Sequence, residues 1–159
     1  MNGGHSVVAM LLGNPRLKVH VFDLMRWNYS QPVAMLLKAT FRERFELHEG
    51  FSFDTLPPWL KSQESAGRNG VKCNVLLVDG GHTQEAARKD LQMLRAVAAP
   101  GHRIVVDDIN MEPGLGLRRL EKQREIHLLE TYYFGKRTEH NPCATAILPS
   151  CILRCSTRA

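Results

Sequence analysis

The sequence predicts an open α/β fold built on a doubly wound, mainly parallel sheet. Three short apolar runs each end on acidic residues, at Asp23, at Asp79 and at Asp107-Asp108. The runs alternate with segments whose apolar residues recur at helical spacing, which is the pattern of βαβ units. Because ligands of such sheets bind beyond the carboxyl ends of the strands, the acidic ends predict a site for a polyol such as ribose or for a hard metal ion.

The elements of the first half follow from turn residues and apolar spacing. A helix over 5–13 is expected after Gly3-Gly4, and Gly13-Asn14-Pro15 ends it. Ser30 is expected to be the N-cap of a second helix. The further elements expected in this half are a strand at 18–23, that second helix at 31–43, a strand at 45–49, a short helix at 54–62 and a surface loop at 62–72.

The second half repeats the alternation. Thr83 is expected to cap a helix whose apolar positions are Ala87, Leu91, Leu94 and Ala98, and Pro100-Gly101 is expected to end it. A turn at Asn141-Pro142 indicates an antiparallel return of the last strand at a sheet edge. The other elements expected are strands at 74–79, 103–107 and 128–134, a helix at 115–127 and the last strand at 144–153.

Length and composition restrict the class of protein. The 159 residues suit one domain over 1–159. No apolar run reaches the roughly 18 to 20 residues that cross a bilayer, and no secretory signal is evident, so a cytoplasmic protein is expected without a membrane partner. The net charge of +5 is scattered among acidic residues, so nucleic acid is not the expected partner. The four cysteines form no zinc-ribbon spacing and are expected to be reduced.

Two stretches resemble a known family. Asn2-Gly3-Gly4-His5-Ser6 resembles the tail of the glycine-rich first motif of class I S-adenosylmethionine (SAM) methyltransferases. Asp79-Gly80-Gly81-His82, followed by Asp107-Asp108, is similar to the metal-dependent small-molecule O-methyltransferases of the catechol, caffeoyl-CoA and macrolide-sugar types. The resemblance covers about residues 2–110 and implies a Rossmann-like fold. Since the family's first strand delivers the glycine loop, that strand is expected to be missing here and the domain to be N-terminally incomplete.

The resemblance assigns the cofactor SAM to the N-terminal motifs. Gly3 and Gly4 would allow close backbone approach, the helix N-terminus would donate to the SAM carboxylate, and His5 and Ser6 would line the loop. Asp23 would accept the ribose hydroxyls, a task that it could equally perform for NAD. The remaining expected cofactor residues are Gly50, Phe51, Ser52 and Asp79. The alternatives are a tight helix-capping turn at the glycines, a solvated loop acid at Asp23 and a simple turn at Gly50.

The acidic strand ends predict a metal site. Asp79, Asp107 and Asp108 offer oxygen ligands that suit Mg²⁺ or a similar divalent cation, which would lower the pKa of a chelated substrate hydroxyl. In the related enzymes a Lys or His three residues after the first acid takes the proton of the attacking hydroxyl, so the resemblance makes His82 the catalytic base. A histidine titrates near neutrality, which suits that task. The alternatives are loop-capping acids and a histidine that merely begins the next helix.

The function predicted from these residues is SAM-dependent methyl transfer to a small-molecule hydroxyl with help from a divalent metal ion. One alternative is an NAD-dependent oxidoreductase, which would share Asp23 but would require a complete G-x-G-x-x-G motif before the first helix. Another is a truncated, non-catalytic domain of the methyltransferase type. The methyl acceptor is not identified, and a homodimer is left open. The other histidines, including His20 and His48, are expected to be structural or at the surface.

Overall fold

The computed structural model describes residues 3–132 and 143–147, and the chain divides into two compact units, residues 1–59 and 60–159. Each contains a sheet of its own, with strand order β1-β2 in the first and β3-β4-β6-β5 in the second. The single sheet and the single domain over 1–159 therefore stay predictions, as does the absent first strand.

The first unit alternates helices with two parallel strands. Its elements are α1 (His5–Gly13), β1 (Val19–Asp23), α2 (Ser30–Phe41), a 3₁₀ turn (Arg42–Arg44), β2 (Phe45–Glu49) and the start of α3 (Ser52–Ser65). The strands pair in parallel from Val19 opposite Phe45 to Asp23 opposite Glu49. The strands at 18–23 and 45–49 and the helix at 5–13 are thus confirmed, and the helix expected at 54–62 is longer at both ends.

The two faces of the β1-β2 sheet differ in chemistry. One face packs against α1 and α2 and forms an apolar core around Val7, Leu11, Leu37 and Phe45. Because side chains alternate along a strand, the neighbours of these core residues point the other way. That second face meets Trp59 of α3, whose ring lies close to the rings of three strand residues: His20, Phe22 and His48.

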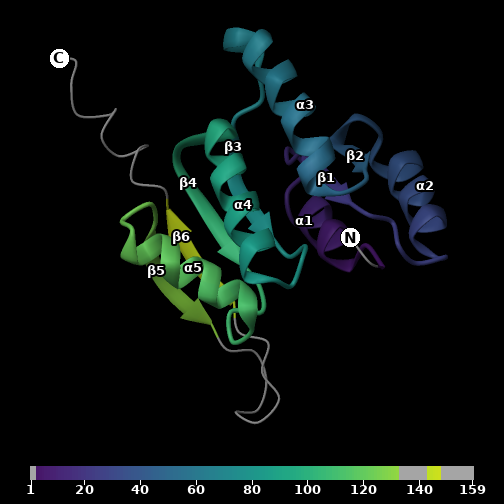
Figure 1. Cartoon of the computed structure of the whole chain (residues 1–159). Helices are drawn as coiled ribbons and strands as arrows, with labels where there is room; N and C mark the ends of the chain where they lie inside the picture. Colours follow the sequence, from purple (N-terminus) through teal and green to yellow (C-terminus); the bar gives the residue numbers. More distant parts are fainter. Residues whose placement is uncertain (1–2, 133–142, 148–159) are drawn as a thin grey trace. The chain divides into compact units, whose positions relative to one another are not determined.

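The second unit is a four-stranded sheet with two helices on one face. Figure 1 shows α4 and α5 side by side in front of the strands. Strand β3 pairs in parallel with β4, whereas β6 is antiparallel to both β4 and β5. Its elements are a 3₁₀ turn (Gly67–Asn69), β3 (Cys73–Val78), α4 (Gln84–Leu94), a 3₁₀ turn (Arg95–Val97), β4 (Ala98–Val106), α5 (Glu112–Lys122), β5 (His127–Tyr132) and β6 (Cys143–Ile147).

The core of this unit lies between the sheet and the two helices. Ile104 and Val106 of β4 are fully buried, and Leu91 and Leu120 supply the helix side of the same core. The last strand is antiparallel as predicted, at Cys143–Ile147, but the prediction that it lies at a sheet edge is wrong, because it pairs with both β4 and β5. The rest of the expected range 144–153 and the turn at Asn141-Pro142 lie outside the described residues. No helix in the described ranges is both long enough and apolar enough to cross a bilayer.

Three local predictions are wrong. Ser30 is not an N-cap: α2 has Tyr29 in that position, and the Ser30 side chain is buried without a hydrogen-bond partner in the described part of the chain. Pro100-Gly101 does not end the helix before it, because α4 ends at Leu94 and β4 runs through the Pro-Gly pair at a register shift. An irregularity in the ladder tolerates proline, which has no N–H to donate. The last helix lies at Glu112–Lys122 rather than at 115–127.

Candidate active site

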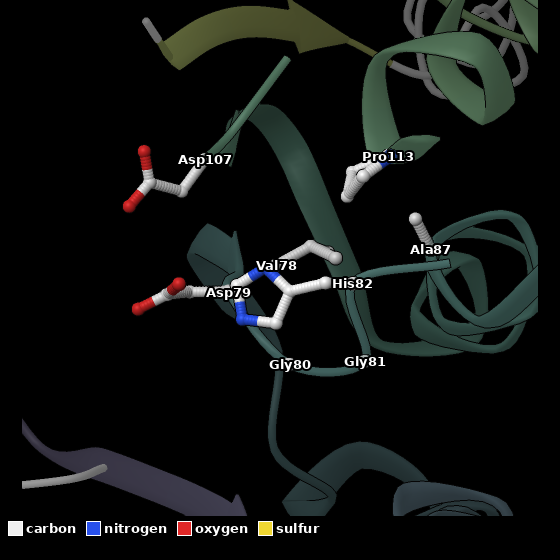
Figure 2. A pocket seen from close by; sticks show the side chains of 8 residues that line it. All are labelled: Val78, Asp79, Gly80, Gly81, His82, Ala87, Asp107 and Pro113. Atoms are coloured by element: carbon white, nitrogen blue, oxygen red, sulfur yellow. The ribbon is translucent and has the colours of Figure 1, made fainter. Parts of the chain in front are cut away.

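The predicted acidic residues of the second unit gather where two parallel strands end. Asp79 follows β3, and Asp107 and Asp108 follow β4. The Asp107 N–H donates to the carbonyl of Val78 at 3.0 Å, which extends the parallel ladder to the site. Figure 2 shows the carboxylates of Asp79 and Asp107 extending to the same side of the strand ends. The prediction that these strand ends lie together is confirmed.

The neighbouring strand ends affect the pKa of the Asp79 carboxyl. Its pKa is raised, first because its surroundings withdraw the group from water and second because the Asp107 carboxylate repels its charge. Asp79 nevertheless remains an exposed residue, so water still reaches it. A group in this position favours either a proton or a cation, since both relieve the repulsion.

Asp108 has the most constrained environment of the three aspartates. Its backbone has a positive φ of 50°, unusual for a non-glycine residue, and the residue is only 8% exposed. Its N–H donates to Oδ1 of Asp107 at 2.9 Å, and its carbonyl accepts from the Met111 N–H at 2.9 Å. These bonds hold a tight turn between β4 and α5 and direct the Asp108 side chain inward.

The Asp108 carboxylate meets His82. Oδ2 of Asp108 lies 2.9 Å from Nδ1 of His82, whose side chain is 55% exposed. Because a carboxylate only accepts hydrogen bonds, this contact places a proton on Nδ1 and leaves Nε2 of the neutral ring as an acceptor. The other oxygen, Oδ1 of Asp108, is buried and has no hydrogen-bond partner among the described residues.

The position of His82 is set by the turn between β3 and α4. Thr83 caps α4, because its Oγ1 accepts the N–H of Ala86 at 3.1 Å, as the sequence predicts. Asp79, Gly80 and Gly81 follow the end of β3, so His82 directly precedes the cap residue Thr83. The prediction that His82 lies beside the acidic strand ends is confirmed, whereas its contact with Asp108 was not predicted.

A small pocket opens between these elements and is drawn in Figure 2. Its walls come from the end of β3, the turn to α4, the end of β4 and the start of α5. The residues that line it are Val78, Asp79, Gly80, Gly81, His82, Ala87, Asp107 and Pro113.

A compact metal-ligand group is not formed by the three aspartates. Within the described ranges, the one trio of possible ligand side chains whose atoms all lie within 4.8 Å of one another is a different one, His20, Glu46 and His48. Magnesium binding by Asp79, Asp107 and Asp108 therefore stays a prediction.

The glycine loop of the first unit has the backbone that the sequence suggests. Gly4 has a φ of 75° at the N-cap of α1, and a Cβ there would approach Cγ1 of Val33 to 2.8 Å. Only glycine satisfies both demands. No side chain caps α1, so its first N–H groups face outward beside the exposed His5 and Ser6. This is the local geometry that binds anions at helix N-termini.

Asp23 and Gly50 lie side by side where β1 and β2 end. The Gly50 N–H donates to the carbonyl of Asp23 at 2.9 Å, and Oδ1 of Asp23 accepts the N–H of Met25 at 2.7 Å. Gly50 has a φ of 135°, which again favours glycine. Phe51 is 57% exposed and Ser52 begins α3. Asp23 therefore shapes the turn after β1 and also stands at the carboxyl end of the sheet.

One cluster was missed by the sequence analysis. His20 on β1 and Glu46 and His48 on β2 form the trio within 4.8 Å, although the histidines were expected to have no constellation around them. The signal is the alternation Val-His-Val-Phe and Phe-Glu-Leu-His, which places polar residues on one strand face. Recognising the cluster requires the strand register, which sequence alone does not supply.

Comparisons with known proteins bear on the family and on the fold of the chain. A family model described as a methyltransferase domain matches residues 1–109. No curated protein matches the chain.

Solved structures share the fold at low sequence identity. The O-methyltransferase TomG from Streptomyces achromogenes, in complex with SAM, superposes with a TM-score of 0.68 at 16% identity, over 92% of this chain and 69% of that one. Cofactor-bound Rv0187 from MTB gives 0.66 at 19% identity, over 92% and 68%. An O-methyltransferase from Bacillus cereus, in complex with SAH, gives 0.58 at 14% identity, over 82% and 62%.

Proposed function

The chain belongs to the methyltransferase domain family, and on that premise we propose that it transfers the methyl group of SAM to the hydroxyl of a small molecule. The observation that carries the proposal is the pairing of His82 with Asp108 beside the acidic ends of β3 and β4. Further support comes from the similarity in fold to TomG and to the Bacillus cereus enzyme, both named O-methyltransferases.

The residues of the first unit fit the cofactor. The uncapped N-terminus of α1, with Gly3, Gly4, His5 and Ser6, offers N–H donors to a carboxylate such as that of SAM. Asp23, at the carboxyl end of β1, would accept the ribose hydroxyls, and Gly50, Phe51 and Ser52 would line the cofactor beside it. In the second unit, Asp79 is proposed to contribute to cofactor binding as well. When bound, SAM supplies a methyl group on a positively charged sulfur.

His82 is proposed as the general base. Its Nε2 accepts the proton of the substrate hydroxyl, while the oxygen forms a bond to the methyl carbon and the carbon–sulfur bond breaks. The products are a methyl ether, S-adenosylhomocysteine and a proton on His82. Asp108 holds Nδ1–H at 2.9 Å, so it fixes the ring orientation and stabilises the imidazolium that forms. The exposed ring can meet a substrate without a rearrangement of the chain.

The proposal includes a divalent cation, which Asp79, Asp107 and Asp108 would bind. The raised pKa of the Asp79 carboxyl and the buried, unpartnered Oδ1 of Asp108 both favour a nearby positive charge. Ligation by all three residues requires side-chain rotation, since they do not form a compact group. A bound Mg²⁺ would polarise a substrate hydroxyl and thereby lower its pKa.

The first experiment is calorimetric titration of SAM into the chain, with NAD as the comparison ligand. SAM is expected to bind and NAD not, and Asp23→Asn is expected to weaken SAM binding about tenfold or more, because it removes a charge-assisted hydrogen bond. Binding of NAD without SAM would reverse the assignment of cofactor.

The second experiment measures transfer of labelled methyl from SAM to catechols and vicinal diols, with Mg²⁺ or with EDTA. His82→Ala is expected to abolish most transfer, whereas His127→Ala, which changes an exposed histidine on β5, is the matched control. Equal transfer by both variants would contradict the assignment of the base.

A further inference from the structure

The face of the β1-β2 sheet that meets Trp59 is polar where a doubly wound sheet is normally apolar. His20, Glu46 and His48 occupy it, and Phe22 and Trp59 provide apolar surface beside them. The register explains the grouping. His20 lies opposite Glu46, and Phe22 lies opposite His48, two residues further along each strand and therefore on the same face. Three ligand-type side chains gathered on one strand face need an explanation other than packing.

The distances within this trio are those of a coordination polyhedron. Nδ1 of His20 lies 3.4 Å from Oε2 of Glu46, and Nε2 of His48 lies 3.4 Å from Oε1 of the same carboxylate. Bonds of about 2.0–2.2 Å from a tetrahedral zinc ion to nitrogen and oxygen correspond to ligand separations of about 3.3–3.6 Å. All ligand atoms lie within 4.8 Å of one another, so small side-chain rotations close the group around one ion.

Hydrogen bonding within the chain does not account for the two ring nitrogens. Nδ1 of His20 and Nε2 of His48 are buried, and neither has a hydrogen-bond partner in the part of the chain that the structure describes. Burial lowers the pKa of both imidazoles, and the charge of Glu46 opposes this effect at each of them. A positive charge on Lys18 lowers the pKa of His20 further, and His20 does the same to His48. Neutral rings present lone pairs to a cation rather than protons to a carboxylate.

Aromatic neighbours hold the rings in place. Phe22 stacks on His48 with ring centroids 4.4 Å apart, and Trp59 lies 5.1 Å from His20 and 5.8 Å from His48. Preorganised imidazoles lose little conformational freedom when they bind an ion. The Glu46 side chain is 53% exposed, so an ion can reach the group from solvent.

From these observations we propose that His20, Glu46 and His48 bind a transition-metal dication, with Zn²⁺ as the expected ion. Two imidazoles and one carboxylate suit zinc and its neighbours in the periodic table, whereas magnesium prefers oxygen ligands alone. Solvent water completes the coordination. Since the ligands come from both strands, the bound ion ties β1 to β2 and stabilises the first unit. These ligands are different residues from the aspartates that follow β3 and β4, and the proposal does not depend on the proposed methyl transfer.

The test uses Zn²⁺ and Co²⁺ as probes on the full chain. Zinc binding is measured by calorimetry and by metal analysis after dialysis. Co²⁺ reports the ligand type through its visible spectrum, since thiolate ligands add an intense near-ultraviolet band that imidazole and carboxylate ligands lack. The variants are His20→Phe and His48→Phe, which keep an aromatic ring against Trp59 and remove the nitrogen. The matched control is His127→Phe, which changes an exposed histidine elsewhere, and Asp107→Asn tests whether zinc is held by the aspartates instead.

The proposal expects one equivalent of Zn²⁺, a thiolate-free Co²⁺ spectrum and a melting temperature raised by zinc. Each cluster variant is expected to weaken zinc binding by about 100-fold or more, because loss of outer-shell partners alone costs about 10–100-fold. The control His127→Phe is expected to match the wild type in zinc affinity and in melting temperature. Wild-type affinity in His48→Phe, a thiolate spectrum, or equal loss in Asp107→Asn would each overturn the proposal. If a variant fails to fold, the Co²⁺ spectrum of the wild type still decides between imidazole and thiolate ligands.

Discussion

Replacing Gly114 by alanine is expected to destabilise the second unit strongly, for a reason that is local and steric. Gly114 lies in the first turn of α5, and a Cβ there would meet the carbonyl oxygen of Ile109 at 1.8 Å and its carbonyl carbon at 2.6 Å. Ordinary contact begins at 3.4 Å, so the helix and the loop must separate by about 1.5 Å. The obstacle is backbone, which cannot rotate away as a side chain would.

The loop that must move carries the site. Ile109 directly follows Asp108, and its carbonyl also accepts a hydrogen bond from Nη1 of Arg118 at 3.4 Å. Both Asp108 and Ile109 are 8% exposed, so displacement opens packed surface. Overpacking of this kind costs about 1–3 kcal/mol, and we expect the upper end of that range, about 3 kcal/mol. The shift would also disturb the contact between Asp108 and His82.

Gly13→Ala is the matched control for this change. Gly13 ends α1, and nothing lies within 4 Å of the position that a Cβ would take. The same chemical substitution is therefore expected to stabilise the chain by about 0.4–1 kcal/mol through the unfolded state. The assay is urea unfolding followed by circular dichroism for the wild type and both variants. A free energy of unfolding for Gly114→Ala within about 0.5 kcal/mol of the wild type would refute the steric reasoning.

Three further predictions address the caps, the carboxylate repulsion and the base. Ser30→Ala should leave the free energy of unfolding unchanged or raise it, because its buried hydroxyl has no partner in the described part of the chain, whereas Thr83→Ala should cost about 1 kcal/mol through loss of a cap. Equal losses in urea unfolding would restore Ser30 as a cap. The raised pKa of Asp79 means that the folded state holds the proton more tightly than the unfolded state, so stability falls as pH rises from the ordinary value of 3.8 through the folded pKa. Asp79→Asn should therefore melt at a higher temperature than the wild type at neutral pH in EDTA, and this difference in melting temperature should disappear in acid. A difference that does not change with pH would exclude the Asp79 charge as its cause. His82→Ala should lower kcat for methyl transfer about 10²- to 10⁴-fold, and Asp108→Asn should also lower kcat while KM for SAM stays the same. A rise in KM alone would make both residues part of substrate binding rather than of proton transfer.

The sequence predicts most elements of the described fold because their signals are local. The apolar runs before Asp23, Asp79 and Asp107 are strands in the structure, and Thr83 caps its helix as expected. Ser30 was wrongly predicted to be an N-cap because residue type alone does not show whether the backbone of a serine before an apolar segment is helical. At Ser30, burial of the side chain replaces the capping role.

The candidate site residues were predicted by their type and by their position in the chain, but their contacts were not predicted. His82 and Asp108 were predicted to follow neighbouring strands. Their pairing depends on the positive φ of Asp108, which no residue pattern predicts for an aspartate. The trio of His20, Glu46 and His48 needs the register of β1 against β2, since a shift of one residue would turn Glu46 to the other face. Contacts between distant residues are therefore the part that sequence patterns leave open.

The place of β6 in its sheet determines when that sheet can be completed. This strand lies between β4 and β5 but follows both in the chain, so within the described residues β5 has no neighbour until β6 arrives. On the ribosome, both strands of the first unit are synthesised early. In the second unit, β4 and β5 are synthesised before β6, so the sheet between them stays incomplete until synthesis passes Ile147. A pause in translation between Tyr132 and Cys143 would leave two open strand edges exposed to other chains. The rate of translation across that interval is thus expected to govern the yield of folded protein.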